Sequence, residues 1–148
     1  MLRPQKKWAV KRRANPLILR PDAWLLLAAV NGFLAVLAGA FAAHGLESHA
    51  DPAALAGFRT GAHYHMYHAL ALIAVAWRAD GRKGAPVVAL AGWGFVVGIL
   101  LFCGSLYVLG LSGSRSLVWV TPLGGVSFLA GWAALAFAAC RGQREFKE

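Results

Sequence analysis

The stretch "PVVALAGWGFVVGILLFCGSLYVLGL", from Pro86 to Leu111, runs for 26 residues without a charged side chain. A helix rises about 1.5 Å per residue and the hydrocarbon core of a bilayer is about 30 Å thick, so about 20 apolar residues cross it. This stretch is therefore long enough to span a membrane once.

The composition of the whole chain also favours a membrane protein. Of its 148 residues, 59% are hydrophobic and only 14% are charged, whereas a soluble domain is about 25% charged. Seven of the 15 Lys and Arg residues lie in residues 1–20, a segment without Asp or Glu. Because aromatic residues other than Trp8 are missing from this tail, it favours membrane topology and lipid headgroups over nucleic acid. Two cysteines, Cys103 and Cys140, do not make a disulfide framework.

Four apolar segments predict an all-α fold, an integral membrane four-helix bundle. Asp22 and Thr121 are expected to cap the first and fourth helices, and Asp51 is expected to cap the second, with Pro52 at its first position. The first helix is longer than the apolar region of a signal peptide, so we expect it to be retained. The predicted transmembrane domain is 22–140, with basic tails at 1–21 and 141–148 and helices at about 23–43, 52–77, 86–111 and 122–140.

The distribution of Lys and Arg predicts the orientation. Thirteen of them lie in the N-terminal tail, the segment 78–83 or the C-terminal tail, and two, Arg59 and Arg115, lie in the other connections. Cytoplasmic segments of membrane proteins are rich in Lys and Arg. Both termini are therefore expected to be cytoplasmic.

Small residues spaced four apart indicate where the helices approach one another, because close packing replaces the hydrophobic effect inside a bilayer. Each such motif is weak alone, since glycine is common in membrane helices. The residues predicted to pack helices are Gly39, Gly57, Gly61, Gly94, Gly98, Gly124, Gly125, Ser127 and Gly131.

Three histidines gather at the start of the second predicted span, in "FRTGAHYHMYHALAL", residues 58–72. His65 and His68 share one helix face, while His63 lies over Tyr67. At most two of the three imidazoles can converge on one ligand, so a metal site would need His44, Glu47 or Cys103 from elsewhere. No metal and no cofactor are expected.

The depth of His68 requires a partner, because an ionisable group inside a bilayer faces the other helices and forms a hydrogen bond. Ser105 and His44 are the candidates by depth. The polar residues of the outer helix halves are expected to form one outward-facing cluster: His44, Tyr64, His65, His68, Cys103, Ser105, Tyr107 and Thr121. No nucleophile with a base, phosphate-binding loop or carboxylate pair is present in the sequence, so we expect no enzymatic activity and no catalytic residue.

Four segments in this order resemble the YgdD-like family of small bacterial inner-membrane proteins, a domain-of-unknown-function family with eukaryotic transmembrane-protein relatives. They are "GAFAAHGL" (39–46), "YHMYHALAL" (64–72), "LFCGSLYVLGL" (101–111) and "TPLGGVSFLAGW" (121–132). The resemblance covers residues 23–140 and implies a four-helix membrane protein without a known activity. Two residues depart from the family pattern: Ala42 replaces a usual glycine and His65 a frequent glutamine. The family-like positions are His44, Tyr64, His68, Gly104, Ser105, Tyr107, Thr121, Pro122, Gly124 and Gly125.

The leading functional hypothesis is a non-enzymatic accessory or scaffold subunit whose polar cluster fixes the bundle. The alternatives are a membrane protein that handles a small molecule, a lipid or protons, and a metal- or haem-binding membrane protein. The expected partners are the lipid bilayer and a larger membrane complex or a homo-oligomer, with no nucleic acid. The expected location is the bacterial inner (plasma) membrane, or the mitochondrial inner membrane in a eukaryote.

Overall fold

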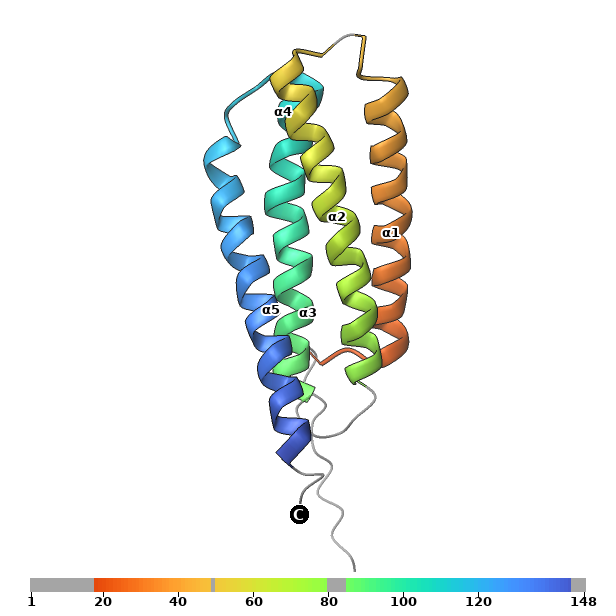
Figure 1. Cartoon of the computed structure of the whole chain (residues 1–148), viewed down its shortest axis with the longest axis vertical. Coiled ribbons are helices and arrows are strands. Elements are labelled where there is room, and N and C mark those ends of the chain that lie inside the picture. The colour runs from red at the N-terminus through yellow and green to blue at the C-terminus, as the bar shows by residue number, and fades with distance from the viewer. Residues whose placement is uncertain (1–17, 49, 80–84, 145–148) are drawn as a thin grey trace, which may run out of the picture.

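The computed structural model describes residues 18–48, 50–79 and 85–144, and all regular structure within these ranges is helical. This confirms the prediction of an all-helical chain. Figure 1 shows long helices running side by side. Their bounds are α1 Pro21–His44, α2 Pro52–Ala79, α3 Ala85–Gly98, η1 Ile99–Cys103, α4 Gly104–Ser112, η2 Val118–Val120 and α5 Thr121–Arg144.

The elements α3, η1 and α4 follow one another without a break and make a single long helix. Its middle section, η1, is a π-helix, and the N–H of Gly104 closes it by bonding to the carbonyl of Ile99. A π-helical turn is a local widening within an α-helix, and the sequence did not predict it. The long helix ends at Gly113, whose φ of 66° is left-handed and whose N–H bonds to the carbonyl of Leu109 at 2.9 Å.

Of the three helix caps that the sequence predicts, the structure confirms one and contradicts two. Asp51 caps α2, because its carboxylate accepts the N–H groups of Ala53 at 3.0 Å and Ala54 at 3.2 Å. The expected cap of α1 was wrong: Arg20 is the N-cap and Asp22 lies inside the first turn. Thr121 is also not a cap, because its backbone is already helical, with φ −52° and ψ −46°.

The helix α2 is central to the packing. It contacts α1 along its length and also contacts α3, η1 and α4, while α5 packs on α3 and η1. The turns that join α1 to α2 and α4 to α5 lie at the same end of the molecule (Figure 1). The C-terminal end of α5 lies at the other end. Consecutive long helices are therefore antiparallel.

Three helices in the described part of the chain are long and apolar enough to cross a membrane: Pro21–His44, Pro86–Ser112 and Val118–Arg141. The helix α2 has 28 residues but is less apolar, since it carries three histidines and Arg59. It also buries twelve residues, against four in α1. Its polar side chains at His65 and His68 are thus covered by neighbouring helices instead of facing lipid.

Glycines allow the closest approaches between helices. A Cβ on Gly94 would lie 2.9 Å from the Cα of Gly131, and a Cβ on Gly98 would lie 2.3 Å from the ring of Phe128. Beside the first of these contacts, the hydroxyl of Ser127 donates to the carbonyl of Gly94 at 2.8 Å. The helices α3 and α5 consequently pack backbone against backbone.

The other glycines of the predicted set differ in how closely they are packed. A Cβ on Gly61 would lie 3.1 Å from the ring of Tyr107, whereas Gly57 and Gly125 have only ordinary contacts, at 3.4 and 3.9 Å. The prediction for Gly39 needs correction, because no heavy atom lies within 4 Å of the place where its Cβ would stand. The helix α1 packs chiefly on α2, and Gly39 is exposed near its C-terminal end.

Candidate functional site

His65 lies at the middle of α2 and joins three helices through both of its ring nitrogens. Its Nε2 is 3.0 Å from the amide oxygen of Asn31 on α1, and its Nδ1 is 3.0 Å from the hydroxyl of Tyr107 on α4. The amide nitrogen of Asn31 donates to the carbonyl of Leu27 at 2.8 Å, so its oxygen is free to accept. Nε2 therefore carries the proton, and Nδ1 accepts from the tyrosine hydroxyl.

His68, one turn further along α2, makes a second and separate set of contacts. Its Nδ1 is 2.7 Å from the carbonyl of Tyr64, and the indole N–H of Trp132 on α5 donates to its Nε2 at 3.2 Å. A carbonyl can only accept and an indole can only donate. His68 is accordingly neutral with its proton on Nδ1, the tautomer opposite to that of His65.

Aromatic rings enclose His68. Its ring stacks on Phe128 with centroids 3.5 Å apart and planes 6° apart, and Phe95 lies at 5.5 Å. Both phenylalanines are buried, and Phe128 is the ring that Gly98 accommodates. The imidazole thus forms part of the contact between α2, α3 and α5.

A third polar contact joins α4 to the start of α5. The hydroxyls of Ser105 and Thr121 are 2.7 Å apart, and Ser105 also donates to the carbonyl of Phe102 at 2.9 Å. Since the hydroxyl of Ser105 has one proton, Thr121 is the donor between the two side chains. The hydroxyl of Thr121 therefore joins the first residue of α5 to α4.

The remaining residues of the predicted cluster differ in their positions. Tyr64 stays beside His68, with ring centroids 6.1 Å apart, whereas His44 is exposed in the last turn of α1 and Cys103 is fully buried in the apolar core. The expected partners of His68 were wrong, because Trp132 and the carbonyl of Tyr64 take the places assigned to Ser105 and His44. Depth along a helix does not fix the direction in which a side chain points.

The polar groups thus form three separate sets of hydrogen bonds in the described part of the chain. His65, His68 and Ser105 are each 4 to 5% exposed, and no buried side-chain nitrogen or oxygen in the described ranges lacks a hydrogen-bond partner. No group of three or more metal-binding side chains occurs among these residues either. Both cysteines are free.

Two residues that complete these contacts were not in the predicted cluster, although the sequence carried a signal for each. Asn31 is the one amide in an otherwise apolar helix, and such residues bond across helices. Trp132 lies at the middle of α5, whereas tryptophans that anchor a helix at the membrane interface lie near its ends. A central indole needs an acceptor for its N–H, which His68 provides.

Long apolar helices joined by fully satisfied polar contacts define a class, that of multi-pass helical membrane proteins. The chain belongs to the family described as "Protein of unknown function (DUF423)", whose model matches residues 38–125. No solved structure matches the chain.

Several bacterial proteins match this chain over most of their own length. The UPF0382 membrane protein YwdK of Bacillus subtilis is 46% identical over 118 residues, which are 80% of this chain and 96% of the relative. A UPF0382 membrane protein of Haemophilus influenzae is 43% identical over 78% of this chain and 92% of its own length. The UPF0382 inner membrane protein YgdD of Escherichia coli is 40% identical over 82% of this chain and 92% of its own length. The chain is a multi-pass protein of the bacterial inner membrane, and its function is unknown.

Proposed function

We propose that this protein is a non-enzymatic accessory or scaffold subunit, a four-helix bundle in the inner membrane with both termini in the cytoplasm. The observation that carries the proposal is that both buried histidines use both ring nitrogens within the fold. A histidine that binds substrate, metal or haem needs a free nitrogen. His65 and His68 instead hold helices together.

The contacts of His65 also argue against a proton relay. From Tyr107 the hydrogen bonds run through His65 to Asn31 and end at the carbonyl of Leu27. A backbone carbonyl can accept a hydrogen bond but has no proton to pass on. This series of hydrogen bonds therefore has a structural role, because it connects α4 through α2 to α1.

The proposed orientation rests on charge and on the antiparallel helices. The turns that join α1 to α2 and α4 to α5 share one end of the molecule. Of the thirteen Lys and Arg residues in the tails and segment 78–83, the described ones Arg20, Arg78 and Arg141 lie at the helix ends on the opposite side. Positive residues favour the cytoplasmic side. Arg59, one of the two remaining cations, pairs with Glu47 at 3.0 Å, which lowers its effect on topology.

Cysteine labelling tests this orientation in a Cys140→Ser background, in which buried Cys103 is protected. A membrane-impermeant maleimide added to spheroplasts is expected to label Ser114→Cys, which lies in an exposed turn. Gln5→Cys and Phe146→Cys should be labelled only after the membrane is opened. Labelling of either terminal variant in closed spheroplasts would reverse the orientation.

Purification in a mild detergent tests the role as a subunit. We expect a second membrane protein to co-purify with the full chain at a fixed ratio, and zinc, copper and iron to remain well below one equivalent. A chain that runs alone in detergent and also fails to cross-link to another protein in membranes would contradict the accessory role. One equivalent of a metal that is lost in His68→Leu would favour the metal-binding alternative.

A further inference from the structure

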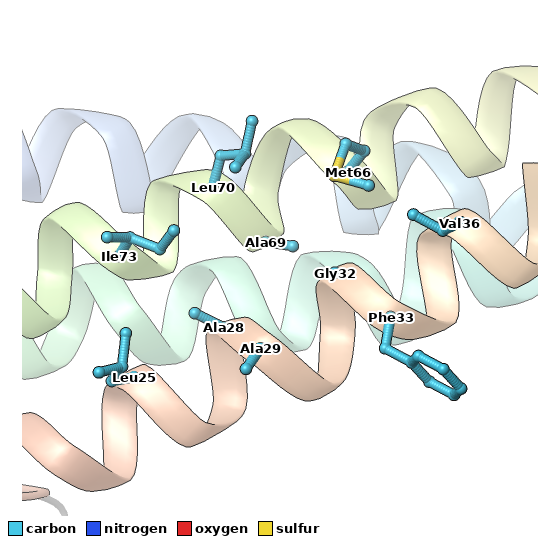
Figure 2. A pocket seen from close by; sticks show the side chains of 10 residues that line it. All are labelled: Leu25, Ala28, Ala29, Gly32, Phe33, Val36, Met66, Ala69, Leu70 and Ile73. Atoms are coloured by element: carbon cyan, nitrogen blue, oxygen red, sulfur yellow. The ribbon is translucent and has the colours of Figure 1, made fainter.

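A groove runs between α1 and α2 on the outside of the molecule (Figure 2). It has a volume of about 350 Å³ and is lined by apolar residues from Leu25 to Val36 on α1 and from Met66 to Ile73 on α2. Its deepest lining residues, Ala28 and Ala69, are buried between the two helices. Gly32, one turn after Ala28, leaves open space where a side chain would stand.

The height of the groove matches one leaflet of a membrane. From Leu25 to Val36 is eleven residues, or about 16 Å at 1.5 Å per residue. Half of the hydrocarbon core of a bilayer is about 15 Å. A groove of this length that begins at the edge of the hydrocarbon layer would reach its midplane, which is the depth that one acyl chain occupies.

The end of the groove nearest the start of α1 becomes polar. A second pocket of about 380 Å³ adjoins the groove, because Leu25 and Ile73 line both, and it is also lined by Asp22 and Trp77. Asp22 lies three residues before Leu25, so it is about 5 Å closer to the headgroups. Trp77 is 80% exposed, as is common for a tryptophan at the membrane interface.

We propose that this groove binds one aminophospholipid, with an acyl chain between α1 and α2 and the ammonium group of phosphatidylethanolamine at Asp22. The carboxylate of Asp22 attracts a cation, and the ring of Trp77 offers a cation a favourable face. The phosphate of the same headgroup is attracted by Arg20, the exposed residue before α1. With the proposed orientation, the lipid belongs to the cytoplasmic leaflet; binding itself does not depend on that orientation.

The shape of the groove favours an acyl chain over a helix from a second copy. A helix with its side chains is about 10–12 Å wide. In Figure 2 the ring of Phe33 and the side chain of Leu70 project on either side of the groove, and both are more than half exposed. A thin chain fits between them, whereas a helix would meet both side chains first.

Two glycines of α1 give a matched pair for the test. No heavy atom lies within 4 Å of the place that a Cβ would take on Gly32 or Gly39, so both tolerate a larger side chain, but only Gly32 lines the groove. Native mass spectrometry of the full-length protein in detergent, with added phosphatidylethanolamine or phosphatidylglycerol, measures binding. We expect one tightly held phosphatidylethanolamine in the wild type and in Gly39→Leu, and its loss in Gly32→Leu. Asp22→Asn should weaken phosphatidylethanolamine about tenfold without weakening phosphatidylglycerol.

Four results would overturn the proposal. Equal lipid binding by Gly32→Leu and Gly39→Leu would mean that the groove is not the site. A preference for phosphatidylglycerol, or an Asp22→Asn variant with unchanged selectivity, would reject the aminophospholipid. A dimer in the wild type that Gly32→Leu alone dissociates would assign the groove to a second copy of the chain. Helix content measured by circular dichroism confirms that each variant is folded.

Discussion

Gly124→Ala is expected to destabilise the protein strongly, while Gly125→Ala, one residue further along α5, should have little effect. A Cβ on Gly124 would lie 2.3 Å from the backbone nitrogen and 2.8 Å from the Cα of Phe102. Backbone atoms cannot rotate away, so α5 would have to move from the π-helix η1. Overpacking of this kind costs about 1–3 kcal/mol and occasionally more. The contact between Ser105 and Thr121, 2.7 Å long, would be strained by the same movement.

Gly125→Ala is the matched control because its nearest atom lies at 3.9 Å, an ordinary van der Waals contact. Alanine also removes backbone freedom from the unfolded chain, which offsets small costs by about 0.4–1 kcal/mol. Thermal unfolding in detergent measures both variants. Equal unfolding temperatures for Gly124→Ala and Gly125→Ala would mean that α5 and η1 do not approach as closely as the structure has them.

Gly124 and Gly125 also illustrate what the sequence could predict. The run "TPLGG" indicates close packing at this helix start, but it does not distinguish the two glycines. Their difference depends on the rotation of α5 against η1, and the widened turn of η1 has no marker in the apolar run 99–103. The all-helical fold, by contrast, follows from segment length and apolarity, which are visible in the sequence.

The polar contacts show the same limit of the sequence. It indicates how far along a helix a residue lies, but not the direction in which its side chain points. His65 and His68 were expected on one helix face, and both are indeed buried. Three residues on a helix turn the side chain by about 300°, so the two rings point about 60° apart. Because of that difference, His65 forms hydrogen bonds with Asn31 and Tyr107, whereas His68 forms one with Trp132. The sequence alone indicated the need for a partner, and only the packing of α5 against α2 identified it.

His68→Leu is expected to destabilise the protein by about 1–2 kcal/mol, because it removes a hydrogen bond and an aromatic stack together. Hydrogen bonds between membrane helices average about 0.6 kcal/mol and reach about 1.7. An aromatic pair contributes about 0.5–1.5 kcal/mol, and the imidazole lies 3.5 Å above Phe128 with nearly parallel planes. The leucine would also leave the indole N–H of Trp132 without its acceptor.

Two further variants separate these contributions. His68→Phe keeps a ring over Phe128 but cannot accept from Trp132, so it should lose only the hydrogen-bond part, about 0.6 kcal/mol. His63→Leu is the control, since His63 is exposed on the same helix and should unfold with the wild type. Unfolding in detergent would show the order wild type and His63→Leu, then His68→Phe, then His68→Leu. If all four unfold together, the contacts of His68 do not hold α2 to α5.

Complementation of a deletion strain extends the same variants to function. If His68 serves only the fold, any defect of His68→Phe and His68→Leu should follow the amount of folded protein in the membrane. Raising expression should then restore the phenotype, because the remaining folded chains are active as a scaffold. A variant that is folded at wild-type levels but inactive would show that His68 has a role in binding or proton transfer. In that case Trp132→Phe, which frees Nε2 of His68 without removing the imidazole, should retain activity that His68→Leu has lost.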